Sequence, residues 1–149
     1  MKTFLKIILL ISLVCISIGL LVIGNGYNMY KEAIEKDPLE QKVEEIKSKE
    51  NYVSLSELPQ IYLNAVISVE DHRFYRHNGI DIIAIGRAVV NDIKAMSFVE
   101  GGSTITQQIA KNEYFTQEKK ITRKIAEVFM AFEIEKNYNK DEILEIYVN

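Results

Sequence analysis

The chain has 149 residues, of which 48% are hydrophobic and 26% charged, and it is low in Gly and Pro. This excludes a disordered or low-complexity chain and suits a single domain. The net charge of −3 conceals an asymmetry, since residues 1–25 hold two lysines and no acid. The remainder is therefore more acidic than the whole chain, which argues against a general nucleic-acid binder. A single cysteine excludes an internal disulfide, and the two histidines form no cluster with zinc-ligand spacing.

A long apolar run opens the chain. Residues 7–23 read IILLISLVCISIGLLVI, without a charge, and with their apolar neighbours they approach the roughly 20 residues that a membrane-spanning helix needs. Lys2 and Lys6 precede the run and all acids follow it, which predicts a cytoplasmic N-terminus and an extracytoplasmic remainder. We therefore predict a transmembrane signal anchor over residues 1–25.

Two other interpretations of this run are weaker. A cleaved signal peptide usually has a shorter apolar core, and no Ala-x-Ala-like site follows here. A lipoprotein signal at Cys15 would need small residues before it, whereas Leu13 and Val14 stand there.

Residues 26–51 are polar. From Tyr30 to Glu50 lysines and glutamates intermix around a break at Asp37-Pro38, and no apolar face is wide enough to build a core. This composition predicts a solvated helix or stalk that separates the membrane from the domain beyond it.

From Tyr52 onward the spacing of apolar residues predicts helices. The first expected helix is largely buried, begins near Ser56–Pro59 and leads to Glu70, and the second runs from about 82 to 96. A third is capped by Ser103 or Thr104 and runs to 112. A fourth runs from 121 or 122 to about 136, with Ile125, Val128, Phe129 and Phe132 inward, and the last runs from near Asp141 to the end. No alternating strand is present, so the predicted fold class is mostly α.

Glu70 to Gly79 is a polar run at the end of an apolar helix. Apolar walls disfavour the charged form of a carboxylate, and Glu70 is therefore a candidate proton acceptor. The alternative is an ordinary helix end, with Asp71 and Arg73 in solvent and Gly79 as a turn.

Residues 101–112 read GGSTITQQIAKN. Small hydroxylated residues at a helix start leave backbone N–H groups for an anion, and Lys111 adds a cation. The Gly-Lys-Ser/Thr of a Walker loop is absent, and a capped amphipathic helix is the alternative.

Two further segments are charged or amphipathic. Cations and one carboxylate gather on or just before one helix, at Lys119, Lys120, Arg123, Lys124 and Glu127. Arg123 and Glu127 share a helix face with the small Ala131. A ladder of surface ion pairs would give the same sequence pattern and is the alternative. Residues 140–149 could form a simple packing helix.

Taken in order, these four segments resemble a known set of motifs. E-D-x-x-F-x-x-H-x-G at 70–79, G-G-S-T-I-T-Q-Q-x-x-K-N at 101–112, R-K-x-x-E at 123–127 and K-x-E-I-L-E-x-Y-x-N at 140–149 are similar to the four motifs of the family 51 glycosyltransferases. That family comprises the transglycosylase domains of class A penicillin-binding proteins and the monofunctional transglycosylases. The resemblance covers residues 52–149.

The resemblance implies a partial lysozyme-like helical domain over residues 52–149, behind the anchor (1–25) and the spacer (26–51). The family's domain continues past the fourth motif, so we expect this chain to be an N-terminal fragment or a truncation that lacks the C-terminal lobe. Whether a transpeptidase domain follows is left open.

The implied reaction joins the reducing-end sugar of a growing, lipid-linked glycan to the 4-hydroxyl of lipid II, with inversion and release of undecaprenyl pyrophosphate. By resemblance Glu70 is the general base, and Glu127 is the second catalytic carboxylate, on the pyrophosphate side. A divalent cation, Mg²⁺ or Mn²⁺, is a candidate cofactor at Glu127.

The remaining site residues also follow from the resemblance. Lys111 corresponds to a pyrophosphate-binding lysine, and Arg123 and Lys124 belong to the same basic wall. The cleft-lining residues are Ser103, Thr104 and Gln107. Relatives often carry arginine near Lys119, and lysine there keeps the charge but loses the bidentate fork.

The implied location is the bacterial cell membrane, in a single pass. The expected partners are lipid II, the growing glycan, the membrane and cell-wall synthesis or division proteins, with no nucleic acid. Two alternatives are a truncated, non-catalytic protein that binds lipid II or a partner, and a tethered muramidase with Glu70 as acid. The muramidase is disfavoured because a hydrolase has no use for a phosphate-binding wall.

Overall fold

The computed structural model describes residues 2–97, 101–116, 118 and 120–149, and every regular element in these ranges is helical. The α-helices are α1 (Lys2–Lys36), α2 (Leu39–Lys47), α3 (Gln60–Glu70), α4 (Ile82–Ala95), α5 (Ile105–Tyr114), α6 (Ile121–Asn137) and α7 (Lys140–Val148), with 3₁₀ turns η1 (Leu55–Glu57) and η2 (Phe74–Arg76). The mostly-α class predicted from the sequence is confirmed.

Capping side chains set the starts of three helices. Asp81 accepts hydrogen bonds from the first N–H groups of α4, Thr104 does so for α5, and Asn139 for α7. The predicted helices beyond residue 52 are all present, and α5 runs to Tyr114 rather than to Asn112.

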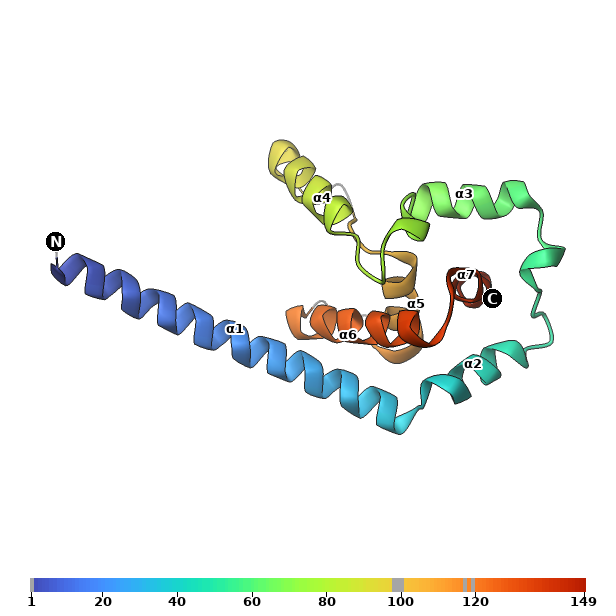
Figure 1. The fold of residues 1–149 in the computed structure, drawn as a ribbon, viewed down its shortest axis with the longest axis horizontal. Helices are drawn as coiled ribbons and strands as arrows, with labels where there is room; N and C mark the ends of the chain where they lie inside the picture. Colours follow the sequence, from blue (N-terminus) through green and yellow to red (C-terminus); the bar gives the residue numbers. More distant parts are fainter. Residues whose placement is uncertain (1, 98–100, 117, 119) are drawn as a thin grey trace.

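In α1 the apolar half stands apart from the rest of the molecule. Its N-terminal part projects from the helical body, and the large side chains from Phe4 to Ile23 are mostly exposed (Figure 1). By length and composition, the stretch Thr3–Lys36 could cross a membrane.

The other half of α1 packs against α6. Phe129 of α6 contacts the ring of Tyr27 edge-on, with centroids 5.2 Å apart, and stacks on Tyr30 at 6.0 Å. Gly26 makes this approach possible, since a Cβ there would lie 2.6 Å from Cγ2 of Ile125. The tyrosines and the glycine thus fasten α1 to the domain.

Residues 30–50, predicted to lack an apolar face wide enough to build a core, nevertheless contribute to the core of the domain. Tyr30 is buried, and so are Leu39, Val43 and Ile46 of α2, in the same cluster as residues of α5, α6 and α7. The three α2 residues stand at i, i+4 and i+7, which places them on one helix face. The intervening lysines and glutamates obscure this narrow stripe in the sequence.

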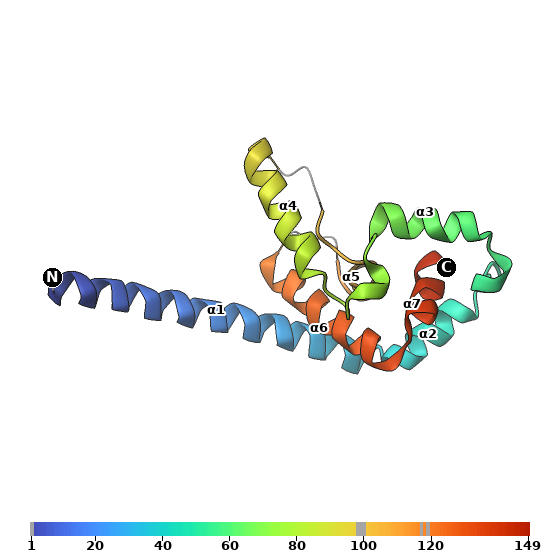
Figure 2. The same ribbon diagram turned by 45° about the horizontal axis from the view of Figure 1, so that its top comes forward.

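The prediction of a largely buried helix before Glu70 is wrong. Leu63 is the buried residue of α3, whereas Ile61 and Val69 are 80% and 81% exposed. α4 is similar, with Ala88 buried and Ile93 exposed. Both helices lie at the outside of the body, and α4 points away from it, so few neighbours cover their apolar faces (Figure 2).

In α6 the inward face differs from the predicted one. Its buried residues are Ala126, Glu127, Met130, Ala131 and Ile134. Phe132, which was expected inward, is exposed because two residues beyond Met130 correspond to about 200° around the helix.

The centre of the body is built by α5, α6, α7 and the turn η2. Its fully buried side chains include Phe74, Ile105, Met130, Ile134 and Ile143. Residues before α3 are bonded to the end of α7, since the side-chain amide of Asn149 donates to the carbonyl of Val53 at 3.0 Å and accepts from its N–H at 2.8 Å. α1, α2 and α3 therefore form an arc around this centre (Figure 1).

The contact between α1 and α6 can be tested at Gly26. Gly26→Ala should lower the free energy of unfolding by about 1 kcal/mol, because overpacking costs about 1–3 kcal/mol against a helix-propensity gain of about 1 kcal/mol. The Cβ would also lie 2.9 Å from the backbone oxygen of Thr122, which cannot rotate away. Thermal unfolding followed by circular dichroism in micelles measures the effect.

Gly24→Ala is the matched control, since nothing lies within 4 Å of a Cβ at that position. It should leave the unfolding temperature unchanged or slightly higher. Equal effects of the two substitutions would contradict the role of Gly26.

Candidate active site

A cleft of about 470 Å³ lies between the end of α3, the start of α4 and the loop before α5. Glu70, Asp71, His72, Asp81, Arg87, Ser103 and Thr104 are among the residues that line it. The cleft therefore brings together the polar runs at 70–79 and 101–112, which the sequence separates by more than twenty residues.

Glu70, the predicted base, is the last residue of α3 and its side chain is exposed. Its Oε2 accepts a hydrogen bond from Nε2 of Gln108 at 2.9 Å. The expectation of apolar walls around this carboxylate is wrong, because the neighbouring apolar residues of α3 face outward and the cleft lining is largely polar.

Asp71 is buried rather than in solvent. Its Oδ2 accepts from the N–H of Ile105 at 3.1 Å and lies 2.9 Å from Nε2 of His77. The first N–H groups of a helix have no partner within the helix, so this carboxylate satisfies one of them at the start of α5. Asp71 thereby fixes the turn that carries Glu70 against α5.

Gly79 and Thr104 make a second connection between the same two segments. The hydroxyl of Thr104 donates to the carbonyl of Gly79 at 2.7 Å. Gly79 has a φ of +89°, and a Cβ would lie 3.2 Å from the carbonyl oxygen of Ala131, so glycine is required here.

Of the predicted cleft-lining residues, Ser103 and Thr104 reach the cleft. Gln107 is instead buried, where its side chain accepts from the N–H of Thr104 at 3.2 Å and completes a capping box. Gln107 thus shapes the start of α5, and it lines a second hollow beside the 102–103 loop rather than the cleft between α3 and α4.

Asp81 lines the cleft at the start of α4. Burial opposes its ionisation, but the N–H groups of Ala84 and Ile83 and the guanidinium of Arg73 outweigh burial and lower the pKa of Asp81. Nε of Arg73 lies 2.9 Å from Oδ2 of this carboxylate. The start of α4 is therefore fixed by a charged pair in the wall of the cleft.

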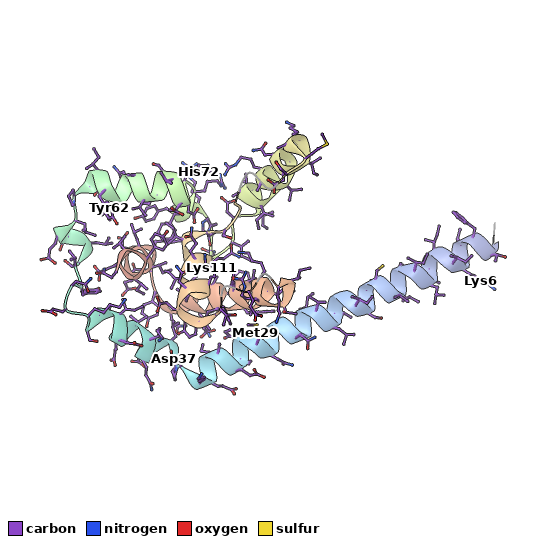
Figure 3. The ribbon with its side chains drawn as sticks, turned by 180° about the vertical axis from the view of Figure 1, so that it is seen from behind. Lys6, Met29, Asp37, Tyr62, His72 and Lys111 are labelled. Atoms are coloured by element: carbon purple, nitrogen blue, oxygen red, sulfur yellow. The ribbon has the colours of Figure 1, made fainter. Side chains whose placement is uncertain are left out.

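Three cations are predicted to form a phosphate-binding wall, and one of them, Lys124, contacts Ser103 in the loop before α5. Nζ of Lys124 donates to the hydroxyl of Ser103 at 2.6 Å and to Oε2 of Glu127 at 2.9 Å. Arg123 forms an ion pair with Oε1 of Glu127, which is 1% exposed. Lys111 projects from α5 near the centre of the body (Figure 3).

The electrostatics of Lys124 show how closely these cations are grouped. Burial, followed by the charges of Arg123 and Lys111, lowers the pKa of Lys124 to about 8. A second hollow, of about 330 Å³, includes Lys124 and shares Gly102 and Ser103 with the main cleft. The loop at 102–103 therefore lies between the cleft that Glu70 lines and the hollow that Lys124 lines.

The residues around Glu127 do not fit a metal site. Its two carboxylate oxygens face Arg123 and Lys124, and the described ranges contain no cluster of three His, Cys, Asp or Glu side chains. Binding of Mg²⁺ or Mn²⁺ at Glu127 stays a prediction. Lys119 lies outside the described residues.

A buried polar network joins the cleft to the fourth motif. Oε1 of Glu135 accepts from Thr106 and from Nζ of Lys140, both at 2.6 Å. The same Nζ lies 4.4 Å above the ring centroid of Phe74. Lys140 thus contacts Phe74 of the first motif directly and is linked to Thr106 of the second motif through Glu135 of α6.

Three residues of the site were not predicted from the sequence, namely Asp71, Gln108 and Glu135. Asp71 and Gln108 stand within runs that resemble family motifs, so the resemblance itself could have marked them as site residues. Glu135 lies outside all four runs, and nothing in the sequence distinguishes it from neighbouring glutamates such as Glu133.

Comparisons with known proteins agree with the motifs. A family model described as Transglycosylase matches residues 37–149. The chain is 48% identical over 101 residues to penicillin-binding protein 1A/1B and 53% identical over 97 residues to penicillin-binding protein 1F, both of Bacillus subtilis. It is 47% identical over 98 residues to penicillin-binding protein 1A of Neisseria gonorrhoeae.

These matches cover 68%, 65% and 66% of the chain. They span 11%, 14% and 12% of the respective relatives, so the chain corresponds to a small part of each. The family match begins within the segment that was predicted to be a spacer.

The buried network can be tested at Lys140. Lys140→Met should lower the free energy of unfolding by about 3 kcal/mol, because it leaves the carboxylate of Glu135 buried without its cation. Lys136→Met is the control, since Lys136 is 75% exposed and lies 3.9 Å from Glu133. Denaturant unfolding should show almost no change for the control, and similar losses in both variants would contradict the assignment.

The low pKa of Lys124 predicts a pH-dependent anion affinity. Deprotonation above about pH 8 removes the ammonium charge, so affinity for a short pyrophosphate diester should fall about tenfold between about pH 7 and about pH 9. Lys124→Arg stays charged throughout this range and should flatten the profile. Calorimetric titration measures both, and a flat profile in the unmodified protein would contradict the prediction.

Proposed function

Because the chain belongs to the transglycosylase family, we propose that it is a peptidoglycan glycosyltransferase. In this proposal it polymerises lipid II into glycan strands and releases undecaprenyl pyrophosphate, with inversion at the reacting carbon. The observation that carries the proposal is that Glu70 lines a cleft on one side of the 102–103 loop, while Lys124, with the charges of Arg123 and Lys111 near it, lines a hollow on the other.

The reaction needs a base and a stabilised leaving group. Glu70 accepts the proton of the 4-hydroxyl of lipid II while that oxygen bonds to C1 of the donor sugar. The bond from C1 to the pyrophosphate oxygen breaks, and its electron pair leaves with the phosphate. Attack from the face opposite the leaving group inverts C1, as it does in two-carboxylate inverting enzymes.

The leaving pyrophosphate requires cations rather than an acid. Lys111, Arg123 and Lys124 supply them, and fixed charges directed at developing negative charge are the main source of such stabilisation. The hydroxyl of Ser103 and the carboxylate of Glu127 keep Lys124 in place before substrate binds.

The proposed location is the bacterial cell membrane. α1 spans it once, with the N-terminus in the cytoplasm and the cleft outside. Both substrates carry lipid tails, so anchoring the domain raises their effective concentration at the cleft. Association with cell-wall synthesis or division proteins stays a prediction.

The family match and the cations beside the cleft support the enzyme over the two alternatives. A muramidase would need an acid for its leaving oxygen and would gain nothing from a cationic wall. A non-catalytic lipid II-binding protein would not need Glu70 to be held by Gln108.

The proposal is tested by Glu70→Gln. The substitution keeps the shape of the side chain and an oxygen that can accept from Gln108, but it removes the base. Polymerisation of fluorescent lipid II by the membrane-anchored protein should fall by about 10²–10⁴-fold. The unfolding temperature should not change, because Glu70 is exposed. Turnover at the original rate in this variant would remove Glu70 from the mechanism.

A further inference from the structure

Glu70 is linked to α7 through two consecutive hydrogen bonds. Nε2 of Gln108 donates to Oε2 of Glu70 at 2.9 Å, and the hydroxyl of Tyr147 lies 3.1 Å from Oε1 of the same glutamine. The three residues come from α3, α5 and α7. The contact therefore joins the first, second and fourth motifs at a single carboxylate.

The chemistry of the three groups fixes the direction of both bonds. An ionised carboxylate only accepts hydrogen bonds, so the amide nitrogen of Gln108 must face Glu70. Its carbonyl oxygen then faces Tyr147 and needs a donor, which the phenol supplies. With the opposite amide orientation, the glutamine oxygen would face the carboxylate oxygen.

Glu70 depends on such a contact for its orientation. Its side chain is exposed at the end of a helix in which Leu63 is the buried residue, so the surrounding packing does not restrict its rotamers. Free rotation of a glutamate side chain carries an entropy that an ordered base must overcome. α7, by contrast, has Ile143, Leu144 and Ile146 buried in the core.

We propose that Tyr147 is a positioning residue for the general base, acting on Glu70 through Gln108. The inference rests on the proposed role of Glu70. Tyr147 fixes the orientation of the Gln108 amide, and the amide in turn holds Oε2 of Glu70. The acceptor sugar then meets a carboxylate that is already in place.

The protonation state of Tyr147 is consistent with this role. Burial, followed by the charges of Glu70 and Tyr62, raises the pKa of Tyr147, so its hydroxyl stays a donor at neutral pH. The ring also packs against the core. A test must therefore remove the hydroxyl and keep the ring, which Tyr147→Phe does.

The kinetic test is a double-mutant cycle in the membrane-anchored protein, with lipid II polymerisation as the readout. Tyr147→Phe should lower kcat about five- to tenfold and leave KM within about twofold, because the hydrogen bond that orients the Gln108 amide is lost while substrate contacts are kept. Gln108→Ala should lower kcat at least as much. In the Gln108→Ala background Tyr147→Phe should have no further effect.

Tyr52→Phe is the matched control. The hydroxyl of Tyr52 forms a hydrogen bond with Glu145 of α7, and this contact does not involve Gln108. Its kcat should stay within about twofold of the original. An equal loss in Tyr52→Phe, or an undiminished effect of Tyr147→Phe without Gln108, would mean that the hydroxyl only steadies α7 and would overturn the proposal.

A spectroscopic test separates this inference from the proposed function. The side-chain ¹⁵N–¹H signals of Gln108, in selectively labelled protein in micelles, should shift in Tyr147→Phe and in Glu70→Ala and stay unchanged in Tyr52→Phe. If the Gln108 signals do not shift in Tyr147→Phe, the positioning role is overturned. Shifted signals in a protein that does not polymerise lipid II would uphold the contact and refute the function.

Discussion

The buried carboxylate of Asp71 is the contact on which the arrangement of the cleft depends. It bonds to the N–H of Ile105 and to His77, which compensates the cost of burying a carboxylate. Glu70 directly precedes Asp71, and Gln108 lies one turn into the helix that Ile105 begins. One side chain therefore sets both the position of the proposed base and that of the amide that contacts it.

Much of the fold follows from local sequence. The capped helix start at Thr104, the last helix from near Asp141 and the ordered polar runs were all predictable, because caps and apolar spacing act over one or two turns. Grouping the runs into one cleft needed the family resemblance, since no local rule brings Glu70 to Gln108. The position of Asp71 was equally hidden: a carboxylate after an apolar helix normally faces water.

The wrong predictions share a physical cause. Apolar spacing indicates which face of a helix is apolar, but it does not reveal whether another element covers that face. α3 and α4 carry apolar faces and remain exposed, whereas α2, with far more charge, buries Leu39, Val43 and Ile46. Coverage is decided by contacts between distant segments, such as that of α2 with α7. Similarly, the stripe predicted on α6 missed Glu127, which is buried because Arg123 and Lys124 neutralise it.

α1 runs without a break from its exposed apolar half to its contact with α6. In the proposed topology a single rigid rod, roughly 50 Å long, therefore links the bilayer to the catalytic domain. A continuous helix transmits each added residue to the domain as a rise of about 1.5 Å along the rod. The height of the cleft above the membrane surface is therefore set by the number of residues between the apolar half of α1 and Gly26.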